Sequence, residues 1–519
     1  MLFHAYNDST WLYPDTPVPS QTELYAADLA RGGSAGVQLL SDAFLDEDAP
    51  VHIRFDAPDH LSCEVFQLLP TLVEENSGRD VLTAERYEDV ADFVTRRAPF
   101  EVYDVTRPLT GGVFRAGRLA LFLLFRAEPC VAKGDYLCVL TFKAGEHALT
   151  FPITLRVSAC VIPPVREARF GMVNWLFLED IEQMHGLDRS TDAFWELVGR
   201  YLDNQLDLRT NHIKLPSGVP VRDESGRVVD FDFTDCEKLG TLALEHGFSY
   251  IYGGFVARFH EWDQPEHFLL WDRDVSTSSI EGYRPLSLYF QKLRRVVEAH
   301  GWQSVWMQCL VDEPQFPNSE SYRALSCICR KHMPGVKIHD PVETTEIGGA
   351  TDIWCVKQAV FEKHLEDFRR LQAMGEEMWI YTCGFPAGKT MNRATDLPLL
   401  AGRLPFWMCV KYGCTGFLHW GYNAYAGRDP LRFNCYSTGG RPLPPGDGFI
   451  VYPGDDGTPW NSVRAQLQRA GAEDAEALLQ LPEDARMALI DRVCRTFDDY
   501  DADPANFEAV RRELLASFA

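Results

Sequence analysis

Two adjacent carboxylic acids, Asp312 and Glu313, have the residue types and the position best suited to chemistry in this sequence. They follow the apolar run Val305–Val311, which is typical of a parallel strand covered on both faces, and they precede Pro314. Catalytic residues of parallel barrels lie at such strand ends, and we interpret the pair as catalytic. A solvated turn with a carboxylate at a helix start is the alternative. Because consecutive strand residues point to opposite faces, both acids can serve one site only if the strand loses its regularity, which Pro314 favours.

The composition disfavours several classes of function. The 519 residues are enough for two or three domains, and 46% hydrophobic and 24% charged residues are ordinary for a globular protein. A net charge of −25 disfavours nucleic acid and membrane surfaces as partners and fits a neutral substrate. No apolar run has membrane-spanning length, and the first residues lack the pattern of a secretory signal, so we expect a cytoplasmic protein.

The metal-binding residue types are scattered. The 14 cysteines include no CxxC pair and no zinc spacing, which favours reduced structural thiols. Asp447 and the pair Asp455-Asp456 stand in turn-rich sequence without EF-hand spacing, and we interpret them as turn residues. We therefore expect no metal and no organic cofactor. The sequence shows no symmetric patch that would define an oligomeric state.

The apolar patterns divide the chain into three parts, a multidomain α/β plus all-β organisation. Residues 1–165 contain short β-branched and aromatic runs between turn residues, which predicts a β-sandwich. Residues 169–425 alternate strands with helices, and eight strands in this length predict a (β/α)8 barrel of the TIM type. We expect residues 426–519 to form a loop and hairpin that close the barrel, followed by a helical C-terminal extension. The predicted barrel strands are Phe170–Trp175, His212–Leu215, Phe248–Gly253, Val305–Val311, Val336–His339, Ile353–Val356, Met378–Thr382 and Gly416–Trp420.

The strand ends also distinguish between mechanisms of glycoside hydrolysis. A common retaining barrel carries an acid/base Glu after strand four and a nucleophilic Glu after strand seven. Here strand four ends in the acid pair, but strand seven is followed by Cys383 and Gly384. Two mechanisms remain, namely inversion through a distant base and attack by the 2-acetamido oxygen of the sugar itself. The second needs one ionised acid, which would be Asp312, and one protonated acid, which would be Glu313; neighbouring carboxylates push each other's pKa values apart.

Three stretches together resemble one known family. They are the Asp312-Glu313-Pro314 strand end, GFLHWGYN at 416–423, and GDGFIVYPGDDGTPWNSVRAQLQRAGAEDAEAL at 446–478. They resemble the catalytic region of glycoside hydrolase family 123 and its relatives in domain-of-unknown-function family 4091, and a sandwich ahead of a barrel fits the same layout. The resemblance implies a retaining β-N-acetylgalactosaminidase that acts on terminal β-linked 2-acetamido sugars through substrate assistance. It assigns the orienting role to Asp312 and the general acid/base role to Glu313.

Other strand ends provide candidate contacts for a carbohydrate substrate. Trp420 follows strand eight, where a Trp face commonly forms the platform under a sugar ring; a plain core role is the alternative. Tyr381 ends strand seven, where substrate-assisted glycosidases often place a Tyr on the acetamido carbonyl. His419, within strand eight, is interpreted as a core histidine. The candidate substrate contacts are Asn174, Trp175, His212, Tyr252, Asp340, Tyr381, Trp420, Tyr422 and Asn423.

Two alternatives to this function remain open. Asp340 and Glu343 follow strand five and are the rival second carboxylates. If one of them acts as the second catalytic group, the substrate is a sugar without the acetamido group. The alternative from another class is a non-catalytic carbohydrate-binding protein that retains the barrel. In every case the expected partner is a glycan or a glycoconjugate.

Overall fold

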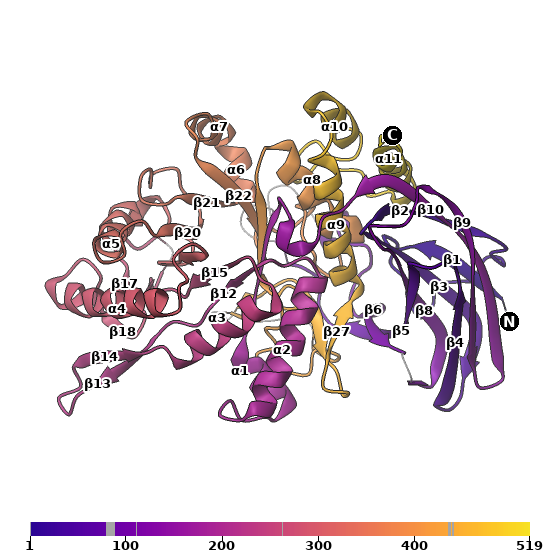
Figure 1. Ribbon diagram of the computed structural model, residues 1–519, viewed down its shortest axis with the longest axis horizontal. Coiled ribbons are helices and arrows are strands. Elements are labelled where there is room, and N and C mark those ends of the chain that lie inside the picture. Colours follow the sequence, from indigo (N-terminus) through magenta and orange to yellow (C-terminus); the bar gives the residue numbers. More distant parts are fainter. Residues whose placement is uncertain are drawn as a thin grey trace.

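The computed structural model describes residues 2–78, 89–109, 112–261, 263–433, 437–438 and 441–518. Figure 1 shows a β-sandwich at one end of the molecule, a barrel with its helices at the other, and the C-terminal helices between them. The predicted combination of sandwich, parallel barrel and helical extension is confirmed. Among the described residues, no helix is both long enough and apolar enough to cross a membrane.

The sandwich has a seven-stranded sheet, β1-β3-β8-β5-β6-β27-β26, in which β26 (Val451–Pro453) and β27 (Pro459–Ser462) come from the C-terminal region. Its second sheet has five strands, β2-β10-β9-β4-β7. Apolar side chains from both sheets form the core between them. Strand β8 is buried on both faces, because its second face packs against Val463 and Leu467 of the C-terminal region. The N-terminal strands are β1 (Phe3–Asn7), β2 (Tyr25–Arg31), β3 (Ser34–Leu45), β4 (Ala49–Asp56), β5 (Leu61–Val73), β6 (Phe100–Pro108), β7 (Val113–Phe114), β8 (Gly117–Ala127), β9 (Gly134–Ala144) and β10 (His147–Val161).

Eight parallel strands close the barrel in the order of the chain. Alternate side chains, such as Val173 and Leu418, point inward and pack together. Trp379 fills the amino end of the barrel, where a Cβ at Gly171 or Gly416 would collide with its indole ring. The strands are β11 (Gly171–Trp175), β12 (His212–Lys214), β15 (Tyr250–Gly253), β19 (Trp306–Gln308), β20 (Lys337–Val342), β21 (Ile353–Lys357), β22 (Glu377–Thr382) and β23 (Gly416–Gly421).

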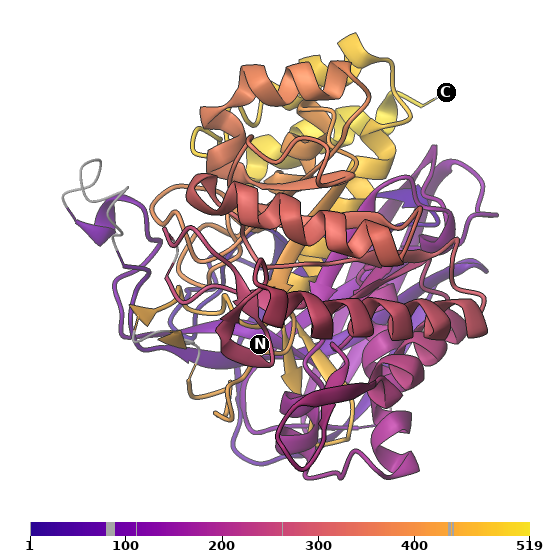
Figure 2. The same cartoon turned by 90° about the vertical axis from the view of Figure 1, so that its left-hand side faces the viewer.

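Amphipathic helices surround the barrel and bury their apolar faces against it. Helices α4 and α5 lie side by side on the side of the barrel away from the sandwich (Figure 1; Figure 2). The connections after β12 and β15 carry the short strands β13 (Val219–Arg222), β14 (Val228–Asp232), β16 (Ala257–Arg258), β17 (Phe268–Leu269) and β18 (Asp272–Ser276). The helices are α1 (Leu178–His185), α2 (Asp192–Asp207), α3 (Thr234–His246), α4 (Ile280–Ala299), α5 (Ser319–His332), α6 (Gln358–Lys363), α7 (Leu365–Ala373) and α8 (Leu404–Lys411).

The C-terminal region connects the barrel to the sandwich. A hairpin of β26 (Val451–Pro453) and β27 (Pro459–Ser462) extends the seven-stranded sheet, because β27 pairs with β6. The hairpin expected beside the barrel therefore belongs to the sandwich sheet. Helix α9 (Val463–Leu478) follows as one buried helix that packs on α8, and its Ser462 Oγ cap accepts the Ala465 amide at 2.9 Å. Helices α10 (Glu483–Ile490) and α11 (Pro504–Ala516) complete the chain.

Candidate active site

The two acids lie on an irregular segment at the carboxyl end of β19. The strand ends at Gln308, before the predicted Val311, and the amide of Leu310 bonds the Asp340 carboxylate at 2.8 Å. Glu313 then adopts left-handed backbone with φ +47°, which non-glycine residues rarely do and which often marks functional sites. This loss of strand regularity removes the constraint that consecutive residues point to opposite faces.

Glu313 is held by donors from strands β21 and β22. The Tyr381 hydroxyl donates to Glu313 Oε1 at 2.5 Å, and Lys357 Nζ lies 3.2 Å from the same oxygen. Lys357 also pairs with Glu343, so one ammonium group serves two carboxylates. Burial alone would lower the pKa of Lys357, but Cys383 and these two carboxylates outweigh it and raise that pKa well above its ordinary value. Burial and then Glu313 raise the pKa of Tyr381 and of Glu343, so that Tyr381 stays a neutral donor.

Asp312 lies in a different environment from Glu313. Among the described residues, no hydrogen bond to the Asp312 carboxylate is found. Burial, followed by the charge of Glu313, raises the pKa of Asp312 to about 7, while Lys214 and Lys357 oppose the shift. The two acids therefore interact with the same Lys357, which places them in one site. Asp312 is free to accept a hydrogen bond from a ligand.

Lys214 provides the second positive charge near Asp312. Its Nζ lies 3.7 Å from the ring centre of Trp175 and 3.4 Å from that of Phe255. Aromatic faces stabilise a cation that has left bulk water. Burial lowers the pKa of Lys214, and Asp312 is among the groups that oppose this shift. Trp175, a predicted sugar contact, therefore positions this ammonium group beside the acids.

Trp420 lies at the same end of the barrel, on β23. It is partly exposed, and its indole Nε1 donates to Asp447 Oδ2 at 2.9 Å. Asp447 is fully buried and also lies 3.3 Å from Nε2 of His419, a buried histidine whose pKa burial lowers to about 4. The Phe177 ring meets the Trp420 ring edge-on, with 6.1 Å between the ring centroids. These contacts fix the plane of the Trp420 ring, as a sugar platform requires.

Asp340 and Tyr252 lie beneath the acids and not beside them. Both oxygens of Asp340 are bonded, one to the Leu310 amide and the other to the Tyr322 hydroxyl, each at 2.8 Å. Asp340 is fully buried, and burial raises its pKa to about 7. Tyr252 is buried in the barrel interior. Asp340 therefore holds the loop that carries the acids, and its oxygens are not available to a ligand.

Three predicted contacts lie on the outer side of the barrel wall. Asn174 alternates with inward-facing neighbours on β11, is fully buried, and accepts a bond from Arg393 at 3.0 Å. Tyr422 is fully buried against α2, to which its hydroxyl is bonded. The Asn423 side chain bonds both the amide and the carbonyl of Phe177 at 2.9 Å. These residues fix the loops around the site without reaching its opening.

His212 lies at the opposite, amino end of the barrel. Its ring stacks on Tyr250 with 4.7 Å between ring centroids and meets Trp379 edge-on with 5.0 Å between centroids. Its Nδ1 lies 2.7 Å from Asn211 Oδ1, to which it is hydrogen-bonded. Burial lowers the pKa of His212 to about 3, so that the ring is neutral. A cavity of about 880 Å³ opens at this end and is lined by the starts of the strands. The structure therefore separates His212 from the two acids.

Lys357, Lys214 and Asp447 complete the site but were not among the predicted substrate contacts. Lys357 directly follows the predicted end of strand six, at Val356, and thus lies at a strand end, where functional residues gather. Lys214 stands two residues after His212 on β12. No local signal connects Asp447 with Trp420, because 27 positions separate them.

Comparison with known proteins identifies the class and the family. Residues 175–481 match the family described as glycoside hydrolase 123, catalytic domain, and this is more than half of the chain. The protein is therefore a glycoside hydrolase. More specifically, the chain belongs to glycoside hydrolase family 123, as the resemblance of its motifs predicted. A search of curated proteins found no match.

One solved structure of a family 123 enzyme shows the same fold. A family 123 glycoside hydrolase from Clostridium perfringens, whose structure was analysed for glycolipid glycan hydrolysis, has a TM-score of 0.76 and 13% identity, covering 99% of this chain and 97% of that chain. A GH10 xylanase with a bacterial Ig-like domain, from termite gut, has a TM-score of 0.35 and 11% identity over 69% of this chain and 91% of that chain. An endo-β-1,4-mannanase from Thermotoga petrophila has a TM-score of 0.38 and 12% identity over 60% of this chain and 77% of that chain.

Proposed function

We propose that this glycoside hydrolase cleaves terminal β-linked 2-acetamido-2-deoxy sugars, GalNAc in particular, with retention and with assistance from the substrate. The observation that carries the proposal is the pair of adjacent carboxylates in unlike environments at the carboxyl end of the barrel. Strand β22 ends at Thr382 and is followed by Cys383, so that the sugar's own acetamido oxygen takes the place of an enzyme nucleophile.

Asp312 orients the acetamido group. Its free carboxylate accepts the acetamido N–H, which directs the carbonyl oxygen toward the anomeric carbon. As that oxygen attacks, positive charge develops on the oxazolinium-like ring, and an ionised Asp312 stabilises it. Lys214 favours the ionised form of Asp312 and so supports this role.

Glu313 acts as the general acid and then as the general base. To donate a proton to the leaving oxygen it must be protonated, and the Tyr381 hydroxyl and the Lys357 ammonium group both contact its Oε1. Two features can free this oxygen. Glu343 shares the charge of Lys357, and a substrate whose acetamido carbonyl bonds Tyr381 withdraws that donor from Glu313. In the second step Glu313 takes the proton of the water that opens the cyclic intermediate.

Glu343 is the residue on which the alternative function depends. Glu313 and Glu343 contact the same ammonium group of Lys357, so their nearest oxygens lie closer than the about 6.5–9.5 Å that separates the carboxyl groups of an inverting pair. This disfavours inversion through Glu343. It leaves Glu343 as the rival nucleophile, in which case the substrate lacks the acetamido group. The hydrogen bonds that both Asp340 oxygens accept inside the wall disfavour Asp340 in this role.

A panel of matched chromogenic glycosides tests the proposal. The β-GalNAc, β-GlcNAc, β-galactoside and β-glucoside of one phenol are compared at the same pH. Turnover confined to the two acetamido sugars supports substrate assistance, and the ratio between them identifies the preferred epimer. Turnover of the plain hexosides contradicts it and points to Glu343. Absence of turnover with all four contradicts the proposed substrate class, and glycan binding without hydrolysis would then favour the non-catalytic alternative.

A further inference from the structure

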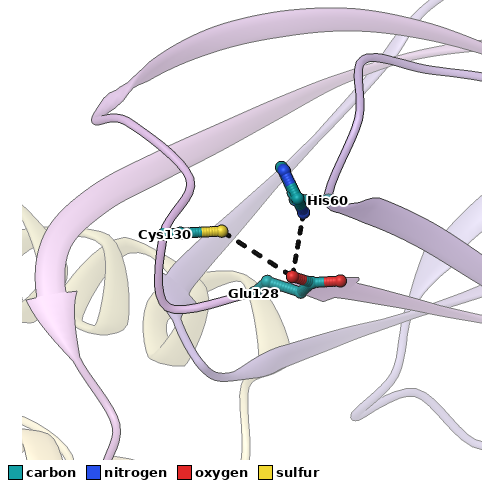
Figure 3. A group of neighbouring side chains, drawn as sticks. All are labelled: His60, Glu128 and Cys130. Atoms are coloured by element: carbon teal, nitrogen blue, oxygen red, sulfur yellow. Dashed lines mark hydrogen bonds and ion pairs between the residues drawn. The ribbon is translucent and has the colours of Figure 1, made fainter.

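A second cluster of chemically reactive side chains lies on the sandwich, far along the chain from the barrel acids. His60, Glu128 and Cys130 project from two adjacent loops, and all three are exposed (Figure 3). His60 Nδ1 lies 2.9 Å from Glu128 Oε2, and Cys130 Sγ lies 3.7 Å from the same oxygen. One ligand atom from each residue falls within 4.8 Å of the other two. Imidazole, carboxylate and thiol thus converge on one point at the surface.

The backbone holds the two loops in register. The amide of Glu128 donates to the carbonyl of His60 at 3.0 Å, and the amide of Val131 donates to the carbonyl of Glu128 at 3.1 Å. His60 adopts left-handed backbone with φ +69°, which non-glycine residues rarely take. This conformation directs the imidazole toward the other loop. The three side chains are therefore brought together before any ligand arrives.

We propose that His60, Glu128 and Cys130 bind one divalent transition-metal ion of the zinc type. Zinc takes nitrogen and oxygen ligands at about 2.0–2.1 Å and thiolate sulfur at about 2.3 Å in tetrahedral geometry, so that neighbouring ligand atoms lie about 3.3–3.6 Å apart. The present separations are 2.9 Å and 3.7 Å from Glu128 to His60 and Cys130, and no more than 4.8 Å between His60 and Cys130, so that rotations of these exposed side chains bring the three atoms to that geometry. Because the cluster is exposed, water completes the fourth position.

The ligand chemistry selects the kind of ion. Binding releases the Cys130 thiol proton to solvent, and Nδ1 of His60 coordinates as the neutral ring with its hydrogen on Nε2. The thiolate and the Glu128 carboxylate then neutralise the two charges of the ion. Soft sulfur with imidazole favours zinc, cobalt or copper over calcium and magnesium, which prefer oxygen. Cysteine spacing gives no indication of this site, because it contains only one cysteine, Cys130. The other two ligands, His60 and Glu128, lie 68 positions apart, so no local motif joins them either.

Cobalt(II) titration of the reduced full-length protein tests the proposal. Thiolate coordination produces an intense sulfur-to-cobalt charge-transfer band, and tetrahedral geometry produces visible d–d bands. We expect one equivalent of Co²⁺ to bind with both signals and one equivalent of Zn²⁺ to displace it. Cys130→Ser should abolish the charge-transfer band, and His60→Ala should weaken binding at least about tenfold.

Matched variants separate this site from adventitious binding. Cys327 and His52 are also exposed, and Cys327→Ser and His52→Ala should leave the titration unchanged. Because all three proposed ligands are at the surface, their substitution is not expected to unfold the protein. A titration without a charge-transfer band, or one in which Cys130→Ser and Cys327→Ser behave alike, would overturn the proposal. Hydrolysis of glycosides does not enter this test.

Discussion

The two ends of the barrel contrast in how their polar groups are partnered. At the amino end, Glu377 accepts the Trp379 indole N–H at 3.2 Å and the Thr415 hydroxyl at 2.8 Å, and His212 is a neutral ring between aromatic neighbours. At the carboxyl end, Lys357 is shared between two acids and Asp312 has no hydrogen bond among the described residues. The amino end nevertheless opens a cavity of about 880 Å³.

The proposed mechanism therefore places the reaction at the carboxyl end on the chemistry of its side chains and not on the volume of a cavity. Polar groups whose hydrogen bonds are all formed stabilise a fold. Groups that share an ion-pair partner or lack a hydrogen bond can change partners when a substrate binds. The two acids of the carboxyl end also differ from each other, because one is held by donors and the other is free. We expect catalysis to depend on the carboxyl end alone and on the difference between its two acids.

The largest expected effect is the loss of the general acid. Glu313→Gln should lower kcat/KM by about 10²–10⁴-fold for glycosides with poor leaving groups, because the leaving oxygen is no longer protonated. Glycosides of an acidic phenol, which leaves without a proton, should be far less affected. Steady-state kinetics over a series of phenols measures this. An equal loss for all leaving groups would contradict the role of Glu313.

The orienting carboxylate is expected to have the next largest effect. Asp312→Asn should lower kcat/KM for acetamido sugars by about 10²–10³-fold, since the amide carries no charge to stabilise the cyclic intermediate. Thermal unfolding should change little, because the Asp312 carboxylate has no hydrogen bond to a described residue. If the variant unfolds at a clearly lower temperature and the folded fraction keeps its activity, Asp312 is a structural residue. That result would contradict the functional difference between the two acids.

Two charged groups that act on Asp312, Lys214 and Glu343, should move the pH profile in opposite directions. In the proposed mechanism Asp312 works as a carboxylate, and because its pKa is raised to about 7, kcat/KM should fall as the pH drops through this region. Lys214 lowers the pKa of Asp312, and Lys214→Met should therefore shift the acidic limb to higher pH. Glu343 raises it, and Glu343→Gln should shift the limb to lower pH. Lys214→Arg keeps the charge and is the control; shifts in the same direction would contradict this account.

The smallest expected effect on catalysis comes from the amino end. His212→Ala removes ring contacts with Tyr250 and Trp379 and should cost about 1–3 kcal/mol of unfolding free energy. The kcat/KM of the folded protein should stay within about twofold of the parent, because no reacting group is touched. Denaturant unfolding and initial rates measure the two quantities. A loss of activity larger than the loss of folded protein would show that the two ends are coupled.

Much of the barrel could be predicted from the sequence, because its strands are buried on both faces and appear as apolar runs. Helix α9 is harder to predict: the sequence pattern favours two helices, Ser462–Arg469 and Ala472–Leu481, where the structure has one. Its buried charges interrupt the apolar pattern, and they are tolerated only because Arg469 pairs with Asp207 at 2.9 Å and Asp474 with Arg403 at 2.8 Å. Partners so distant in sequence cannot be identified from a local pattern.

The site was predictable where a strand end defined it and not where tertiary contacts did. The positions of Asp312, Glu313, Tyr381 and Trp420 follow from the ends of predicted strands. The outward orientation of Asn174 follows from the strand period of two once the inward residues are known. The role of Lys357 depends on two carboxylates from other strands, and its charge alone is more typical of a surface residue.

The central claim is that the sugar's acetamido oxygen is the nucleophile, and a series of N-acyl substrates tests it most directly. Aryl β-GalNAc glycosides that carry acetyl, fluoroacetyl, difluoroacetyl and trifluoroacetyl groups are compared at fixed pH. Each fluorine withdraws electrons from the carbonyl oxygen and weakens its attack, so we predict a steep stepwise fall in kcat/KM across the series. A flat response would contradict the account and direct attention to Glu343 as an enzyme nucleophile.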